Sequence, residues 1–374
     1  MSKPVILTGL RANNDLHIGN YLGALLPIVD MAKRRAGEYQ VNLFVPDLHS
    51  FTTPIDHDGL QAGIRQNLRV FAAAGLPLDN PDVHLYRQSY VPAHSELTWI
   101  LDCFTGMGEM QRMTQFKSKA VDLLGQGGSV TAEIKAEDGD LVHSQDQASK
   151  NDEERHDRIS VGLFNYPVMM AADILLYGAE YVPVGDDQTQ HLEFARDVAE
   201  RLNNKFGELF TVPKPVKQQH EFFGKDQGLR IKDLADPAKK MSKSEASGKG
   251  VIFLTDTPDE AKQKIMAATT DSVGKITYDQ ADQPGIANLM DILALFGGRD
   301  LAAVRQEYDG QTQYGPLKDA VAEAMGRFLS AFQAELAKVD DQAITDKLVT
   351  SEKLMNEQAN STLLKVQQAV GLRG

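Results

Sequence analysis

The chain has 374 residues, of which 42% are hydrophobic and 24% charged, a composition typical of a soluble enzyme with two or three domains. Its net charge of −13 argues against wide, sequence-independent wrapping of nucleic acid, and a single cysteine, Cys103, excludes an internal disulfide and any multi-cysteine zinc site. The apolar run from Val5 to Leu7 is too short for a signal peptide or a membrane span. We therefore expect a cytoplasmic protein with neither a membrane nor DNA as a partner.

Strands and helices are expected to alternate in the first part of the chain. The apolar run from Val5 to Thr8 predicts a buried strand followed by a turn and a helix, and residues 41–50 and 82–89 predict two more strands. Between these two, residues 60–76 have the apolar spacing of a helix. Alternating strands and helices predict parallel βαβ units and hence an α/β fold with a doubly wound, Rossmann-like sheet.

A polar segment then interrupts this pattern. Residues 121–158 carry ten acidic and four basic residues among glycines, a composition that favours an insertion without a packed core. The pattern resumes with a helix, a strand from Tyr181 to Val184 and an amphipathic helix. From about residue 259 onward the spacing is helical throughout. We expect an α/β domain over residues 1–250 and a helical domain over residues 251–374.

The start of the first predicted helix is a candidate phosphate site. The sequence has neither a Walker loop nor a Gly-x-Gly-x-x-Gly turn, but LHIGNYLGAL follows the first strand directly. A helix start offers backbone N–H groups and the positive end of the helix dipole, both of which suit phosphate. Gly19 lets a flat ligand approach the backbone, while His17 and Asn20 offer donors. Taken alone, His17 is better explained as a capping or core histidine.

A second candidate is the segment DPAKKMSKSEASGKG, residues 236–250. It places four lysines among serines and glycines in a stretch too polar for a core. Such a segment indicates a mobile cationic arm whose usual target is phosphate, and the alternative is a solvated surface loop.

Together these segments resemble the paired HIGH and KMSKS signatures of class I aminoacyl-tRNA synthetases. Lys240 to Ser244 match the second signature at every position, and the first matches at three of four, with Asn20 in place of the last histidine. Nearly the whole chain apart from the insertion resembles the tryptophanyl-tRNA synthetase family through GNYLGAL, VPAH, RMTQFK, YPVMMAADILLY, VPVGDDQTQHLEFARDVAERLN and DPAKKMSKS. The tyrosyl-tRNA synthetase family shares the fold but usually carries a different substrate helix and a KFGKS-like loop.

Asp173 is the candidate specificity residue. It lies in the apolar helical segment MMAADILLY, with Met170 and Tyr177 on its own face. A buried carboxylate needs a donor, because leaving it unpaired is costly. An ion pair with a nearby arginine or lysine is one explanation. The resemblance implies another, in which the carboxylate accepts the indole N–H of tryptophan.

The resemblance also implies the remaining site residues. The expected catalytic contacts to phosphate are His17, Asn20, Lys117, Lys240 and Lys243. The expected ATP-binding residues are Leu10, Arg11, Gly19, Asn20, Gly185, Asp187, Gln188, Lys240, Met241, Ser242, Lys243 and Ser244. The expected tryptophan-binding residues are Leu7, Gly9, His49, Tyr166, Met170, Asp173, Val182, Val184 and Gln188, of which the two valines are equally well explained as plain core. At Arg11 the sequence departs from bacterial members, which usually have glutamine there.

The implied function is the ATP-dependent attachment of L-tryptophan to tRNA(Trp) through a tryptophanyl-adenylate. The resemblance further implies a homodimer and a helical domain that binds the tRNA anticodon. Mg²⁺ is implied by ATP, but no cluster of acidic residues identifies protein ligands for it. The alternatives are a tyrosyl-tRNA synthetase and a non-charging paralogue that binds only RNA or nucleotide.

Overall fold

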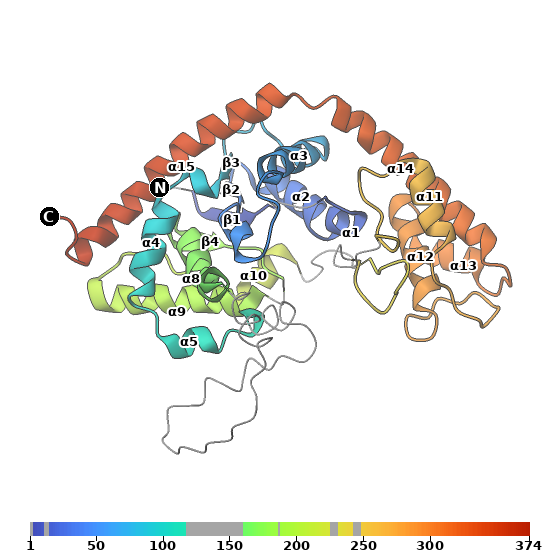
Figure 1. The fold of residues 1–374 in the computed structure, drawn as a ribbon, viewed down its shortest axis with the longest axis horizontal. Coiled ribbons are helices and arrows are strands. Elements are labelled where there is room, and N and C mark those ends of the chain that lie inside the picture. Colours follow the sequence, from blue (N-terminus) through green and yellow to red (C-terminus); the bar gives the residue numbers. More distant parts are fainter. Residues whose placement is uncertain (1–2, 11–14, 117–159, 186–187, 225–230, 242–247) are drawn as a thin grey trace, which may run out of the picture.

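The computed structural model describes residues 3–10, 15–116, 160–185, 188–224, 231–241 and 248–374. In this part of the chain, four strands form a parallel sheet with the order β3-β2-β1-β4 (Figure 1). Its strands are β1 (Val5–Gly9), β2 (Gln40–Val45), β3 (Val83–Arg87) and β4 (Ala179–Tyr181). The chain moves outward from β1 in both directions, which confirms the predicted doubly wound α/β fold.

Helices flank the sheet, and the regular elements described after β4 are all helices. Those before β4 are α1 (Ile18–Asn20), a π-helical turn η1 (Tyr21–Leu25), α2 (Leu26–Arg35), α3 (Leu60–Ala73), α4 (Ala93–Asp102), α5 (Met107–Gln111) and α8 (Val161–Leu175), with short 3-10 turns η2 (His49–Thr52) and η3 (Gln88–Tyr90). After β4 come α9 (Thr189–Phe206), α10 (Val216–Phe223), α11 (Pro258–Met266), α12 (Pro284–Phe296), α13 (Leu301–Tyr308), α14 (Gly315–Ala337) and α15 (Asp341–Ala369). The predicted change to helices alone near residue 259 is confirmed.

Neighbouring residues along the strands pack into two different cores. Ile6, Val41 and Leu43 belong to the core that includes α2 and α3, whereas Leu7 and Phe44 belong to the core that includes α4, α8 and α9. Because both faces of the sheet are covered, the strands are apolar along nearly their whole length.

The strand β4 differs from its prediction. It covers Ala179–Tyr181, whereas the sequence predicts a strand from Tyr181 to Val184. Pro183 has no N–H to donate to a ladder, and the N–H of Val182 binds Oε1 of Gln219 on α10 at 3.0 Å. The strand therefore ends at Tyr181, and the chain continues toward the site without regular structure.

The last helix, α15, returns to the sheet and runs beside its edge strand β3 and α4 (Figure 1). Ser351 Oγ accepts the N–H of Leu85 at 3.1 Å, and Glu352 accepts the N–H of Arg87 at 3.3 Å and its guanidinium N–H groups at 2.6 and 3.0 Å. Side chains of α15 thus pair the N–H groups that an edge strand leaves open. Helices α11 to α14 pack on one another instead, and the division of the chain at residue 250 stays a prediction.

None of the described helices is both long enough and apolar enough to span a membrane.

Candidate active site

The candidate site lies where the strands of the sheet end. Gly9 is the last residue of β1, and the turn with His49 follows β2. Gln88 follows β3 directly, and residues 182–185 follow β4. In doubly wound sheets, ligands bind at this carboxyl edge. The fold thus brings four segments, distant in sequence, to one edge of the sheet.

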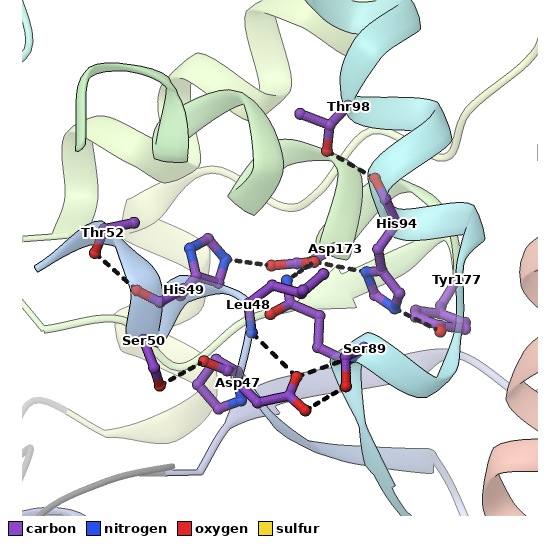
Figure 2. Close-up of polar contacts among 12 residues, drawn as sticks. Asp47, Leu48, His49, Ser50, Thr52, Ser89, His94, Thr98, Asp173 and Tyr177 are labelled. Carbon is purple, nitrogen blue, oxygen red and sulfur yellow. Dashed lines mark hydrogen bonds and ion pairs between the residues drawn. The ribbon is translucent and has the colours of Figure 1, made fainter. Parts of the chain in front are cut away.

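Asp173 lies at the centre of this site, near the end of α8 (Figure 2). Its side chain is 1% exposed. The helix begins at Ser160, whose hydroxyl accepts the N–H of Leu163 at 3.0 Å, and it packs against both α4 and α9. Because its faces are covered by other helices, α8 is apolar on nearly all sides, and Asp173 needs donors from its neighbours.

Three side chains donate to the Asp173 carboxylate. His49 Nε2 lies 2.7 Å from Oδ2, and His94 Nδ1 lies 2.6 Å from Oδ1 (Figure 2). Gln88 Nε2 also lies 2.7 Å from Oδ1. A carboxylate only accepts, so each of these nitrogens carries the hydrogen. The other ring nitrogen of His94, Nε2, lies 2.9 Å from the hydroxyl of Tyr177. Within the described part of the chain, the partners of Asp173 are therefore two histidines and a glutamine, not the arginine or lysine of the ion-pair explanation.

These donors keep Asp173 ionised. Burial alone would raise the pKa of its carboxyl, but the charge and hydrogen bonds of His49 and His94 outweigh burial and lower the pKa to about 2. Burial also raises the pKa of Tyr177 far above its ordinary value, so its hydroxyl keeps its proton. At neutral pH the cluster presents a buried carboxylate that accepts hydrogen bonds.

Aromatic and apolar side chains surround Asp173. The hydroxyl of Tyr166, two turns before it on α8, lies 2.9 Å from His191 Nε2, and the Tyr166 ring meets the ring of His49 edge to face at 6.3 Å. The other residues proposed for tryptophan are placed as follows: Leu7, Val182 and Val184 are buried in the core that includes α8, and Met170 is half-buried against it.

The HIGN signature forms its own helix cap. His17 Nδ1 accepts the N–H of Asn20 at 3.2 Å, and Asn20 Oδ1 accepts the N–H of His17 at 3.3 Å. The N–H of Ile18 donates to the carbonyl of Ile252 at 3.0 Å. The backbone N–H groups of Ile18 and Asn20, at the helix start predicted to bind phosphate, are therefore already hydrogen-bonded within the protein. His17 caps the helix, as expected for this histidine when it is considered alone. The two N–H donors of the Asn20 amide take no part in the cap.

The KMSKS segment begins beside this cap. Met241 is buried, and its N–H donates to the carbonyl of Ile231 at 3.0 Å. A Cβ added to Gly19 would lie 3.5 Å from the Cβ of Met241, so the two signatures meet at these residues. Lys240, directly before Met241, is exposed.

The remaining predicted residues are only partly described. Leu10 is buried and its N–H donates to the carbonyl of Phe44 at 2.7 Å, while Gln188 caps α9 and its N–H binds the carbonyl of Gly185 at 2.8 Å. The predictions for Arg11, Lys117, Asp187, Ser242, Lys243 and Ser244 lie outside the described residues.

Sequence reasoning missed two of the three donors to Asp173. Gln88 is the first residue after β3, and His94 ends the VPAH segment that carries part of the family resemblance. A polar residue at the carboxyl end of a predicted strand is a usable signal for Gln88. Nothing in the local sequence indicates that His94 faces Asp173.

Within the described residues, no group of three or more histidine, cysteine, aspartate or glutamate side chains is placed to hold a metal ion.

A doubly wound parallel sheet, with an HIGN cap beside the first residues of a KMSKS segment, defines a class I aminoacyl-tRNA synthetase. Residues 2–330 match the family model described as tRNA synthetases class I (W and Y). The chain is 39% identical over 372 residues to tryptophan–tRNA ligase from Leifsonia xyli subsp. xyli, covering 98% of this chain and 97% of that protein.

Solved structures of tryptophanyl-tRNA synthetases are also similar to this chain. The crystal structure of tryptophanyl-tRNA synthetase from Mycoplasma pneumoniae has a TM-score of 0.75 and 32% identity, covering 99% of this chain and 98% of that one. The Campylobacter jejuni tryptophanyl-tRNA synthetase complexed with ADP and tryptophan has a TM-score of 0.73 and 27% identity, covering 98% and 99%. The chain belongs to the tryptophan–tRNA ligase family of class I synthetases.

Proposed function

We propose that this protein attaches L-tryptophan to tRNA(Trp) in two steps. First, a carboxylate oxygen of tryptophan attacks the α-phosphorus of ATP, the bond from that phosphorus to the β-phosphate breaks, and pyrophosphate leaves. Then the terminal ribose hydroxyl of the tRNA attacks the carbonyl carbon of the adenylate, and AMP leaves. The observation that carries the proposal is the buried, ionised Asp173 at the carboxyl edge of the sheet. The chain's similarity to tryptophan–tRNA ligases and to a synthetase complexed with ADP and tryptophan supports it.

Asp173 gives this site its selectivity in our proposal. The indole N–H of tryptophan is a donor that matches a buried carboxylate, and phenylalanine has no such donor. A site that leaves a buried polar group unpaired can reject an analogue by roughly 10⁴- to 10⁵-fold. Leu7, Gly9, His49, Tyr166, Met170, Val182, Val184 and Gln188 complete the proposed tryptophan site.

The phosphates lie at the two signatures in this proposal. His17, Asn20, Lys117, Lys240 and Lys243 contact them, and the adenosine is bound along Leu10, Arg11, Gly19, Gly185, Asp187, Gln188, Met241, Ser242 and Ser244. The attacking carboxylate is already an anion, so the first step needs no general base. Positioning and stabilisation of the charge that moves onto pyrophosphate carry the rate enhancement.

The test is amino-acid-dependent exchange of pyrophosphate into ATP. We expect exchange with tryptophan and none above background with tyrosine or without amino acid. Exchange with tyrosine would instead identify a tyrosyl-tRNA synthetase, and no exchange with either amino acid would identify a non-charging paralogue.

We also propose that residues 251–374 bind the anticodon region of tRNA(Trp). Bound tRNA should then protect lysine side chains of this segment from acylation, whereas tryptophan and ATP alone should not. Protection confined to residues 1–250 would contradict the assignment.

The same proposal includes a homodimer in the cytoplasm. Trp99 on α4 is 71% exposed, and the exposed Met107 and Val161 lie on α5 and α8, which pack together, as do α4 and α8. Large apolar side chains on neighbouring helices suit a second copy of the chain. Light scattering should give twice the chain mass of 41.1 kDa, and a monomeric mass at micromolar concentration would contradict the dimer.

A further inference from the structure

Gln88 and His94 are held rigidly where they meet Asp173. His94 is 0% exposed, with both ring nitrogens engaged, by Asp173 on one side and Tyr177 on the other. Its ring lies 5.6 Å from the ring of Tyr177 and 6.1 Å from that of Tyr86. Gln88 is also fully buried, and its Oε1 has no hydrogen-bond partner among the residues that the structure describes, so the bond to Asp173 is what fixes its amide. Burial and these hydrogen bonds hold both side chains at Oδ1.

His49 is held much less firmly. Its side chain is 19% exposed, compared with 1% for Asp173 and 0% for His94. It lies on the short turn η2, and Asp173 is its one hydrogen-bonded side-chain partner among the described residues. On the other side its ring meets Tyr166 edge to face at 6.3 Å. Of the three donors, His49 is therefore the one through which a ligand can reach Asp173.

The two carboxylate oxygens differ accordingly. Oδ1 already accepts two hydrogen bonds, from Gln88 and His94, whereas Oδ2 accepts one, from His49. A carboxylate oxygen has about two lone-pair sites, so Oδ1 is saturated. A buried Oδ2 without any donor would destabilise the free protein, which explains why a histidine occupies it.

We propose that Gln88 and His94 are positioning residues that fix Oδ1 of Asp173, whereas His49 is a placeholder on Oδ2 that the indole N–H of bound tryptophan replaces. The inference rests on the proposed function, because it names the atom that reads the indole. When tryptophan binds, its indole N–H takes the place of His49 as the donor to Oδ2, so the buried carboxylate stays hydrogen-bonded throughout. An analogue without the N–H displaces His49 without replacing its hydrogen bond.

The first test measures selectivity for the N–H. The assay is pyrophosphate exchange with tryptophan and with 3-(3-benzothienyl)alanine, in which sulfur replaces the indole N–H. His94→Leu removes the Nδ1 donor, and we expect the ratio of kcat/KM for the two substrates to fall about 10- to 100-fold. His94→Asn keeps an N–H at the position of Nδ1 and should restore most of the ratio. Gln88→Met removes the other donor to Oδ1 and should also lower the ratio, in case His94→Leu does not fold.

The matched control is another buried histidine of the same region. His84 on β3 has Asp82 and Lys347 as charged neighbours and no contact with Asp173 among the described residues. His84→Asn should leave the ratio unchanged. Equal loss for both substrates in His94→Leu and Gln88→Met would overturn the positioning role. If the wild-type protein supports no exchange with tryptophan, the proposed function fails instead, and the two failures are distinct.

The second test measures tryptophan affinity of the His49 variants by calorimetry without ATP. In His49→Leu the free protein loses a donor that the bound protein does not use, so affinity should stay equal or rise, by up to about tenfold. In His94→Leu it should fall. His49→Gln keeps a donor at the position of Nε2 and so separates loss of the hydrogen bond from loss of the ring. Weaker binding by His49→Leu, with His49→Gln restoring it, would show that His49 remains a partner in the complex and would overturn the exchange.

Discussion

The two sides of the proposed site differ in how far they are assembled without ligand. On the amino-acid side, Asp173 already accepts three hydrogen bonds from η2, η3 and α4, and it is buried. On the phosphate side, His17 and Asn20 bond to each other, and Lys240 is exposed to solvent. The difference follows from burial: a buried carboxylate must be paired in the free protein, whereas an exposed lysine is stabilised by water.

This difference suits the two sides to different tasks, the amino-acid side to substrate recognition and the phosphate side to stabilisation of the transition state. A preformed acceptor binds the correct amino acid before any chemistry begins, which makes it suited to recognition. Cations that remain in water can approach the polyphosphate as its charge shifts onto the leaving pyrophosphate, which favours the transition state over the ground state. Variants on the two sides should therefore fail in different steps.

The largest expected effect is on the phosphate side. Lys243→Ala should slow single-turnover formation of the adenylate by roughly 10²- to 10³-fold, the scale for losing one well-placed donor to developing charge. The measurement is rapid-quench formation of the adenylate at saturating ATP and tryptophan. An unchanged rate would remove the lysine segment from the mechanism.

The next effect is on the amino-acid side. Asp173→Ala should lower kcat/KM for tryptophan in pyrophosphate exchange by roughly 10²-fold, because the indole N–H loses its acceptor and His94 and Gln88 lose theirs. The KM for ATP should stay within a few-fold of the wild-type value. Equal losses for both ligands would argue that Asp173 is structural.

The third prediction concerns acid stability. The folded pKa of Asp173, about 2, lies below the ordinary value of 3.8, so its ionisation stabilises the fold above pH 4 and is lost as pH falls toward 2. This contribution is roughly 2 kcal/mol. In Asp173→Asn, the free energy of unfolding from urea titrations should fall less between pH 4.5 and pH 2.5 than in the wild type. Parallel curves for the two proteins would show that Asp173 is not ionised in the fold.

The smallest expected effect concerns the support that α15 gives to the sheet edge next to Gln88. Glu352 of α15 pairs with Arg87, next to Gln88, and the two side chains are 10% and 18% exposed. Glu352→Gln should lower the free energy of unfolding by about 1 to 3 kcal/mol, since it weakens a largely buried charged hydrogen bond. Asp30→Asn, which breaks the exposed pair with Arg34, is the control and should cost less than about 0.5 kcal/mol. Equal costs would mean that α15 does not support this edge of the sheet.

Periodicity and turn chemistry predict most of the fold. The apolar strands β1, β2 and β3 and the amphipathic helices follow from local spacing, because the sheet buries both faces of its strands. The end of β4 was misplaced because Pro183 and Gln219, and not apolar spacing, decide where pairing stops. The return of α15 to β3 is also not visible in its sequence, since its partners on the sheet lie more than 260 residues earlier.

The candidate site also contains residues that the sequence identifies and residues that it does not. Asp173 is recognisable because a carboxylate in an apolar helix is anomalous by itself. Its donors are not, since Gln88 and His94 are 85 and 79 residues away in sequence and meet it only after α4 and α8 have packed together. Local sequence identifies a group that needs partners, and tertiary packing decides which partners it receives.

The structure indicates that the amino-acid side is assembled before ATP binds. The most direct test of this is equilibrium binding of tryptophan without ATP to Asp173→Ala and Lys243→Ala, measured side by side by calorimetry. We expect Asp173→Ala to bind tryptophan roughly 10²-fold more weakly, whereas Lys243→Ala should bind it as the wild type does. Equal weakening in both variants, or unchanged binding by Asp173→Ala, would contradict it.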